Sequence, residues 1–201
     1  MAYSDFTLDS AVRLLDVSFA ETKLFPNLKP ASVPSWLPDS LQRGRALSLV
    51  SEKSRSEFIV APILLAAREL ANDRFMVLSG QRLDVDAKRG LTGECDFILA
   101  ITHSALLLRS PILALVEAKK HDIEAGLGQC IAQMIAARTF NENEGRKPAA
   151  VFGCVTTGED WQFLKLVDST VELDGRRLYL ASVAEILGTI LAIVEETEAK
   201  S

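Results

Sequence analysis

Two charged side chains, Glu117 and Lys119, stand at the end of an apolar run in the stretch PILALVEAKKHD, residues 111–122. The run from Ile112 to Val116 is typical of a central strand that is buried on both faces. Because residues i and i+2 of a strand point to the same face, Glu117 and Lys119 should stand side by side. Buried charges cost free energy unless something engages them. The two groups therefore either pair with each other or serve a metal ion and an anionic substrate.

The spacing of an acidic residue two positions before a lysine carries little information by itself. It also begins at Glu21, beside a proline-rich segment, at Asp86, before a glycine-containing turn, and at Glu198, near the end of the chain. Only Glu117 closes a continuous apolar strand. The context of the segment, and not the spacing, selects Glu117 and Lys119 as candidates for a site.

Asp96 supplies a second carboxylate. It lies two residues into a predicted strand, GECDFILAI (93–101), where burial and strand propensity both disfavour Asp. A lone Asp within a strand more often makes a turn or a hydrogen bond than it binds a metal. Beside Glu117 on the next strand, however, the two carboxylates could hold a hard cation such as Mg²⁺, which retains water and accepts phosphate oxygens.

The pattern of elements predicts an α/β sandwich with a mixed sheet. The first helical segment contains Pro62 and is expected as two helices or one kinked helix. Three strands, a helix and a fourth strand follow it, which gives the order αβββαβ. These elements are expected at 41–72, 74–87, 93–101, 111–119, 123–140 and 149–157. A hairpin at 170–180 should turn at Asp174-Gly175, and a closing helix should run from Ser182 to about Glu198. No glycine-rich nucleotide-binding loop is present.

The N-terminal region differs in character from the rest. Leu8, Val12, Leu15 and Phe19 have helical spacing within residues 1–25. Prolines then recur every four residues, at positions 26, 30, 34 and 38. This spacing forbids a regular helix and predicts an extended arm that lies over the body. Trp36 and Leu37 are expected to anchor the arm. We therefore divide the chain into an arm, 1–43, and a main domain, 44–201.

Composition limits the classes of function. A net charge of −5 and a pI near 5.2 argue against a protein coated in positive charge for nonspecific nucleic-acid binding. The apolar stretch 183–194 contains Glu185 and is too short to span a bilayer, and the N-terminus lacks a signal-peptide pattern, so we expect no membrane partner and a cytoplasmic location. The cysteines form no CxxC pair and are expected to be free core thiols: Cys95, Cys130 and Cys154.

Asp96 and the tripeptide Glu117-Ala118-Lys119, within this order of elements, resemble the PD-(D/E)XK nuclease superfamily, which has the restriction-endonuclease-like fold. The resemblance covers roughly residues 50–195, and the phrases that carry it are RSEFIVAPIL, GECDF, VEAKK, AGLGQCIAQM and VTTGEDWQFLKL. They look like one uncharacterised branch. Cys95 stands where the motif has proline, a position that varies widely in the superfamily.

The resemblance implies that Asp96 and Glu117 bind Mg²⁺, with Mn²⁺ as a substitute. It implies that Lys119 orients or activates water and offsets charge on the phosphate. Members often add an acidic residue from the first core helix, for which Glu57 is our first choice and Glu52 the second. Both glutamates read equally well as exposed helix charges.

Members also often carry a glutamine in the helix after the lysine strand. Gln129 and Gln133 are four residues apart in that helix and therefore share a face. Polar surface residues would show the same spacing, so two interpretations stay open.

The implied reaction is metal-assisted hydrolysis of phosphodiester bonds, with DNA favoured over RNA and with endonuclease and exonuclease action both open. No protein nucleophile is needed, which agrees with the lack of a GxSxG motif. Two alternatives remain: a silent relative that binds nucleic acid or a protein, and an interaction domain whose charged cluster is a structural ion-pair network. A homodimer is a further option, because many such enzymes cut two strands as dimers, although no residue specifies an interface.

Overall fold

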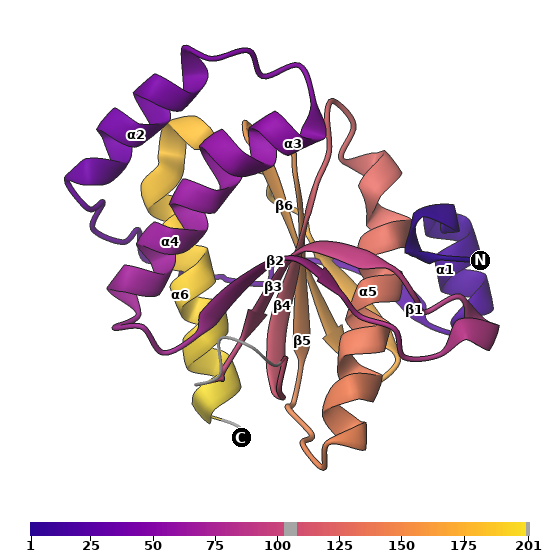
Figure 1. Ribbon diagram of the computed structural model, residues 1–201. Helices are drawn as coiled ribbons and strands as arrows, with labels where there is room; N and C mark the ends of the chain where they lie inside the picture. Colours follow the sequence, from indigo (N-terminus) through magenta and orange to yellow (C-terminus); the bar gives the residue numbers. More distant parts are fainter. Residues whose placement is uncertain (103–107, 200–201) are drawn as a thin grey trace.

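The protein is built around a mixed β-sheet that separates two layers of helices (Figure 1). The computed structural model describes residues 1–102 and 108–199. One face of the sheet is covered by α2 (Trp36–Arg45), α4 (Ala61–Leu70) and α6 (Val183–Ala199). The other face is covered by α1 (Leu8–Leu14) and α5 (Glu124–Asn143). The predicted α/β architecture with a mixed sheet flanked by helices is confirmed.

The described sheet has eight strands in the order β1-β7-β6-β5-β4-β3-β2, with β8 paired to β6. Their bounds are β1 Ser18–Thr22, β2 Met76–Arg82, β3 Glu94–Ala100, β4 Ile112–Ala118, β5 Val151–Thr156, β6 Asp160–Val167, β7 Thr170–Asp174 and β8 Leu178–Tyr179. The pairs β4–β5 and β1–β7 are parallel, and the other pairs are antiparallel. β4 lies inside the sheet and all of its residues are buried, as its continuous apolar run predicts.

The helical segment before β2 is divided by a change in helix type. After α2 the chain forms α3 (Glu52–Arg55), then a π-helical turn, η2 (Ser56–Val60), and then α4. Pro62 lies in the first turn of α4, directly after the π-helical turn. The regular hydrogen-bond pattern has already changed there, so the missing N–H of proline is tolerated.

The predicted hairpin at 170–180 is wrong. β7 pairs with β6 on one side and with β1 on the other, and β8 also pairs with β6. The tight turn lies at Asp168-Ser169 instead, between the paired residues Val167 and Thr170, and Asp168 adopts a left-handed φ of 49°. Asp tolerates this conformation, and the earlier turn buries Val171 against the α5 side of the sheet.

The N-terminal helix is shorter than its apolar spacing suggests. α1 ends at Leu14, and Phe19 lies in β1, which extends the sheet beside β7. Residues 26–35 form no regular helix or strand, but α2 begins at Trp36 and extends past the predicted boundary at residue 43. Leu37 is fully buried, whereas Trp36 is partly exposed and donates a hydrogen bond of 2.7 Å from Nε1 to Glu69.

Two apolar cores fill the spaces between the layers, one on each face of the sheet. The three cysteines are free and buried in these cores, as predicted. Within residues 1–102 and 108–199, no helix is long and apolar enough to cross a membrane.

Candidate functional site

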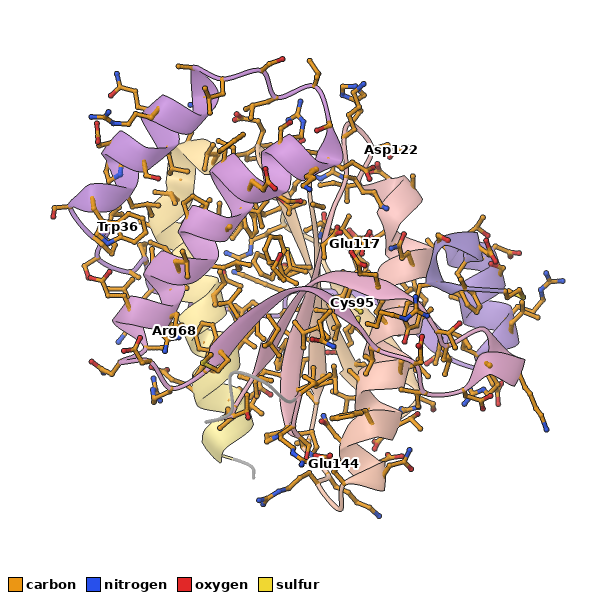
Figure 2. All side chains as sticks on the ribbon, in the orientation of Figure 1. Trp36, Arg68, Cys95, Glu117, Asp122 and Glu144 are labelled. Atoms are coloured by element: carbon orange, nitrogen blue, oxygen red, sulfur yellow. The ribbon has the colours of Figure 1, made fainter. Side chains whose placement is uncertain are left out.

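The charged end of β4 lies between α3 and the N-terminal half of α5. Figure 2 shows Glu117 near the middle of the view, just above Cys95. β4 is held by β3 on one side and by β5 on the other, so its end is fixed by the sheet. The charged residues come directly after the apolar run, which ends at Val116.

Glu117 and Lys119 form a buried ion pair, with 2.9 Å between Lys119 Nζ and Glu117 Oε1. The Glu117 side chain is 3% exposed and the Lys119 side chain 17%. The same-face geometry expected for residues i and i+2 of a strand therefore holds. The pair is largely shielded from solvent, and only Lys119 is partly exposed.

Both candidate glutamines of α5 contact this pair. Gln129 Oε1 accepts a hydrogen bond of 3.0 Å from Lys119 Nζ, and Gln133 Nε2 donates one of 2.8 Å to Glu117 Oε2. Gln133 is completely buried, which rules out its interpretation as a polar surface residue. The close approach of α5 requires Gly126, since a Cβ there would lie 2.6 Å from Val155 Cγ1 and 3.0 Å from Lys119 Cγ.

Asp96 reaches the site from β3, where the β3–β4 ladder ends. The last backbone pair at this end is Phe97 with Val116. Beyond it, Asp96 Oδ2 accepts a hydrogen bond of 2.8 Å from the backbone N–H of Ala118. The Asp96 side chain thus takes the place of a backbone carbonyl as hydrogen-bond partner of β4. Its charge also acts on Glu117.

The two helix carboxylates occupy different positions. The charge of Glu52 acts on both Asp96 and Lys119. Glu57 lies 3.9 Å from Lys53 and its side chain is 52% exposed, although it lines the same cleft as Glu52 and Asp96. Both glutamates are exposed and line the cleft, and of the two it is Glu52 whose charge acts on Asp96 and Lys119.

Burial controls the electrostatics of the cluster. Burial, together with the neighbouring Asp96 charge, raises the pKa of Glu117 to about 7 against the opposing effect of Lys119 and Gln133. The pKa of Asp96 is also raised by burial, although the Ala118 N–H opposes this shift. Burial lowers the pKa of Lys119, but Glu117, with the charges of Glu52 and Asp96, outweighs burial, and the pKa is raised. Glu117 consequently titrates near neutral pH.

The donor set suits Mg²⁺ in chemistry, because the acceptors are carboxylate and amide oxygens. Among the described residues, no group of three or more His, Cys, Asp or Glu side chains is arranged to hold a metal ion. Both oxygens of Glu117 accept hydrogen bonds, one from Lys119 and one from Gln133. In the described part of the chain, Gln133 Oε1 is buried without a hydrogen-bond partner, an acceptor that bound water or a cation would satisfy. Asp96 and Glu117 would hold the ion, with Glu52 as the adjacent third carboxylate.

Sequence reasoning missed two residues at this site. Glu94 lines the cleft beside Asp96. Gly80 lies opposite Asp96 on β2, with a φ of 63°, and interrupts the pairing between Ser79–Phe97 and Gln81–Cys95. A glycine inside a predicted strand is a signal for a bulge or a close approach, and it could have identified this position.

A further missed residue, Asn141, supports β4 from its opposite end. Its buried side chain accepts from the N–H of Ile112 at 2.7 Å and donates to the carbonyl of Ile112 at 3.0 Å. We expect Asn141→Ala to destabilise the protein by about 2–4 kcal/mol, because two buried backbone groups lose their partner. Urea denaturation will measure the change, and Asn143→Ala, at an exposed position of the same helix, should be neutral within about 0.5 kcal/mol. Equal losses in both variants would contradict the role of Asn141.

Comparison with known proteins adds no identification: the chain matches no protein-family model, and no curated protein is significantly similar to it in sequence.

Proposed function

We propose that the protein is a metal-dependent nuclease with a restriction-endonuclease-like core, which hydrolyses phosphodiester bonds in nucleic acid, DNA in preference to RNA. The observation that carries the proposal is the convergence of Asp96, Glu117 and Lys119 at the ends of two neighbouring strands. Two carboxylates at such a place can hold a metal ion, and an ammonium group can stabilise the charge that develops on the phosphate when water attacks it. The order of a helical segment, three strands, α5 and β5 around them supports the same assignment.

The residues divide the work as follows. Asp96 and Glu117 would hold Mg²⁺, which polarises a phosphoryl oxygen and lowers the pKa of bound water. Lys119 would donate to the phosphate or orient the attacking water. It also contacts Gln129, so its ammonium keeps a hydrogen-bond partner when it turns away from Glu117. Gln133 fixes the orientation of Glu117 through Oε2.

The alternative is a silent domain of the same architecture that binds nucleic acid or a protein. The observation that favours it is the closed ion pair between Lys119 and Glu117, together with the lack of a prearranged metal group among the described residues. A structural ion pair would need neither metal nor substrate.

The deciding experiment incubates the protein with labelled single-stranded and duplex DNA in Mg²⁺, Mn²⁺ or EDTA. We expect cleavage in either metal, none in EDTA, and a loss of roughly 10²-fold or more in Asp96→Asn, which keeps the shape of the side chain but removes its charge. Thermal unfolding of the variant should show that it is folded. No cleavage of either DNA by wild type in Mg²⁺ or Mn²⁺ would favour the silent module, and undiminished cleavage by Asp96→Asn would refute the assignment of the site.

A further inference from the structure

A cleft of about 620 Å³ leads away from Asp96 between the α3–η2–α4 segment and the edge of the sheet. Among its described lining residues, Glu52 and Leu65 stand on the helical side, and Val77 and Gly80 on the strand side. This volume lies in the range of sites that hold one small molecule or one group of a larger ligand.

The chemistry of both walls changes in the same direction along the cleft. The helical wall begins with Glu52 and ends with Leu65, while the strand wall is polar at Gly80 and apolar at Val77. Because β2 follows α4 after a short connection and packs against it, the two apolar ends lie together, and the two polar ends lie together at Asp96. The cleft is thus half acidic and half apolar.

The acidic half cannot attract a nucleic-acid backbone by itself. Of its described lining residues four are carboxylates, Glu52, Glu57, Glu94 and Asp96, against one cation, Lys53, which already lies 3.9 Å from Glu57. Phosphates would be repelled everywhere except where a cation is held. Binding in this cleft therefore has to draw on the metal and on contacts other than those between phosphates and basic side chains.

The apolar half offers such a contact. Leu65 is 52% exposed although it stands in a cleft, and Ala61 and Val77 beside it are only partly buried. At the junction of the halves, Gly80 has no side chain and is exposed, which leaves room for a ligand to pass Asp96. An apolar wall this close to the catalytic carboxylates would receive the group next to the reacting phosphate.

Resting on the proposed nuclease function, we propose that the cleft is a nucleobase subsite and that the substrate is an unpaired strand. A phosphodiester lies at Asp96, and the neighbouring base lies against Leu65, Ala61 and Val77. A base within a duplex is stacked and paired, so it would have to leave the helix to enter a cleft of this kind. Because basic contacts to phosphate are few, the affinity should depend only weakly on salt, unlike that of a basic groove.

The test measures binding by fluorescence anisotropy, with Ca²⁺ replacing Mg²⁺ so that binding is observed apart from cleavage. Three labelled probes of equal length are compared: a single-stranded DNA, its blunt duplex, and a single strand without bases. We expect the single strand to bind about tenfold more tightly than the other two. Leu65→Ala should weaken its binding about fivefold by removing apolar contact, while Leu14→Ala, with the same 52% exposure on α1, should bind like wild type.

Equal affinity for the single strand, the duplex and the strand without bases would overturn the base subsite. Equal weakening by Leu65→Ala and Leu14→Ala, or a steep loss of affinity with salt, would overturn it as well. These outcomes leave the nuclease intact if DNA is still cleaved in a metal-dependent way that needs Asp96. Absence of binding by every probe overturns the subsite, and only absence of cleavage in addition refutes the nuclease.

Discussion

Lys119→Met should abolish the proposed metal-dependent DNA cleavage, with a fall in rate of roughly 10²-fold or more. Methionine keeps most of the length of the side chain but cannot donate a proton or a hydrogen bond to phosphate or water. The variant keeps both proposed metal ligands, Asp96 and Glu117, so cation binding should persist. A loss of cleavage with retained binding of metal would assign Lys119 to the chemical step.

The chain contains a closely matched control, Lys165. Its side chain is also 17% exposed and its Nζ lies 2.7 Å from Glu196, so it is a lysine of equal burial in an ion pair of similar length. It lies on β6, away from the β3–β4 end of the sheet. Lys165→Met should cleave DNA within about twofold of wild type, since surface and peripheral substitutions act mainly on stability.

The measurement is the cleavage rate at saturating Mg²⁺, at a temperature where circular dichroism shows wild type and both variants to be folded. If Lys119→Met and Lys165→Met lose activity to the same extent, the effect is one of stability and not of chemistry. Full activity of Lys119→Met would remove this lysine from the mechanism, and the buried ion pair would then be structural.

The sequence was sufficient to predict the elements whose signals are local. The continuous apolar run of β4 predicts a strand inside the sheet, and the i, i+2 rule predicts the contact between Glu117 and Lys119. The position of β7 could not be predicted in this way. Asp174-Gly175 fits a tight turn locally, but pairing of β7 with β6 and β1 is a long-range choice made by the packing of the whole sheet.

The site shows the same division between local and long-range information. The spacing of Gln129 and Gln133 predicts that they share a face of α5. That this face contacts Lys119 and Glu117 depends on how α5 packs on β5, which spacing does not reveal. The choice between Glu52 and Glu57 depends on the π-helical turn η2, which begins between them. Such a turn changes the angular position of every later residue, so spacing on a regular helix cannot say which glutamate faces Asp96.

The role of Asp96 in particular could not be read from its neighbours in the sequence. Its carboxylate takes the N–H of Ala118 because backbone pairing between β3 and β4 stops at Phe97 and Val116. Where a ladder stops depends on the twist of the strands, which composition does not reveal. Asp96 appears misplaced within a strand of the sequence, but in the fold it lies where backbone pairing between β3 and β4 has ended.

The second large effect concerns stability: without metal, the protein should become less stable as the pH rises from 4.5 to about 7. Burial raises the pKa of Glu117 from 4.5 to about 7, so the folded state holds a proton that the unfolded state has released. The contribution is fully present below pH 4.5 and is lost as the pH passes the folded pKa. The raised pKa of Asp96 acts in the same direction, whereas Lys119 titrates above this window.

Glu117→Gln should remove this dependence, because glutamine imitates the protonated carboxyl group. At pH 8 in EDTA we expect the variant to be more stable than wild type by up to roughly 3 kcal/mol, and to be similar at pH 4.5. The amide that replaces the carboxylate can donate to Gln133 Oε1, which lacks a partner in the described part of the native chain, once the Gln133 amide rotates. The same substitution should abolish cleavage, so stability would be gained where function is lost.

Urea denaturation at a series of pH values in EDTA measures both effects, with Glu159→Gln as the control. Glu159 pairs with Arg45 near the surface, so its replacement should leave the slope of stability against pH unchanged. On the proposed function, Mg²⁺ binds only the ionised carboxylates of the native state. Adding it at pH 8 should therefore stabilise wild type and leave Glu117→Gln unaffected. If wild type instead gains stability from pH 5 to 8, and Glu117→Gln is the weaker protein at pH 8, then Lys119 and Gln133 more than offset the burial of Glu117. The cluster would in that case be a structural ion-pair network, which has no need of a cation.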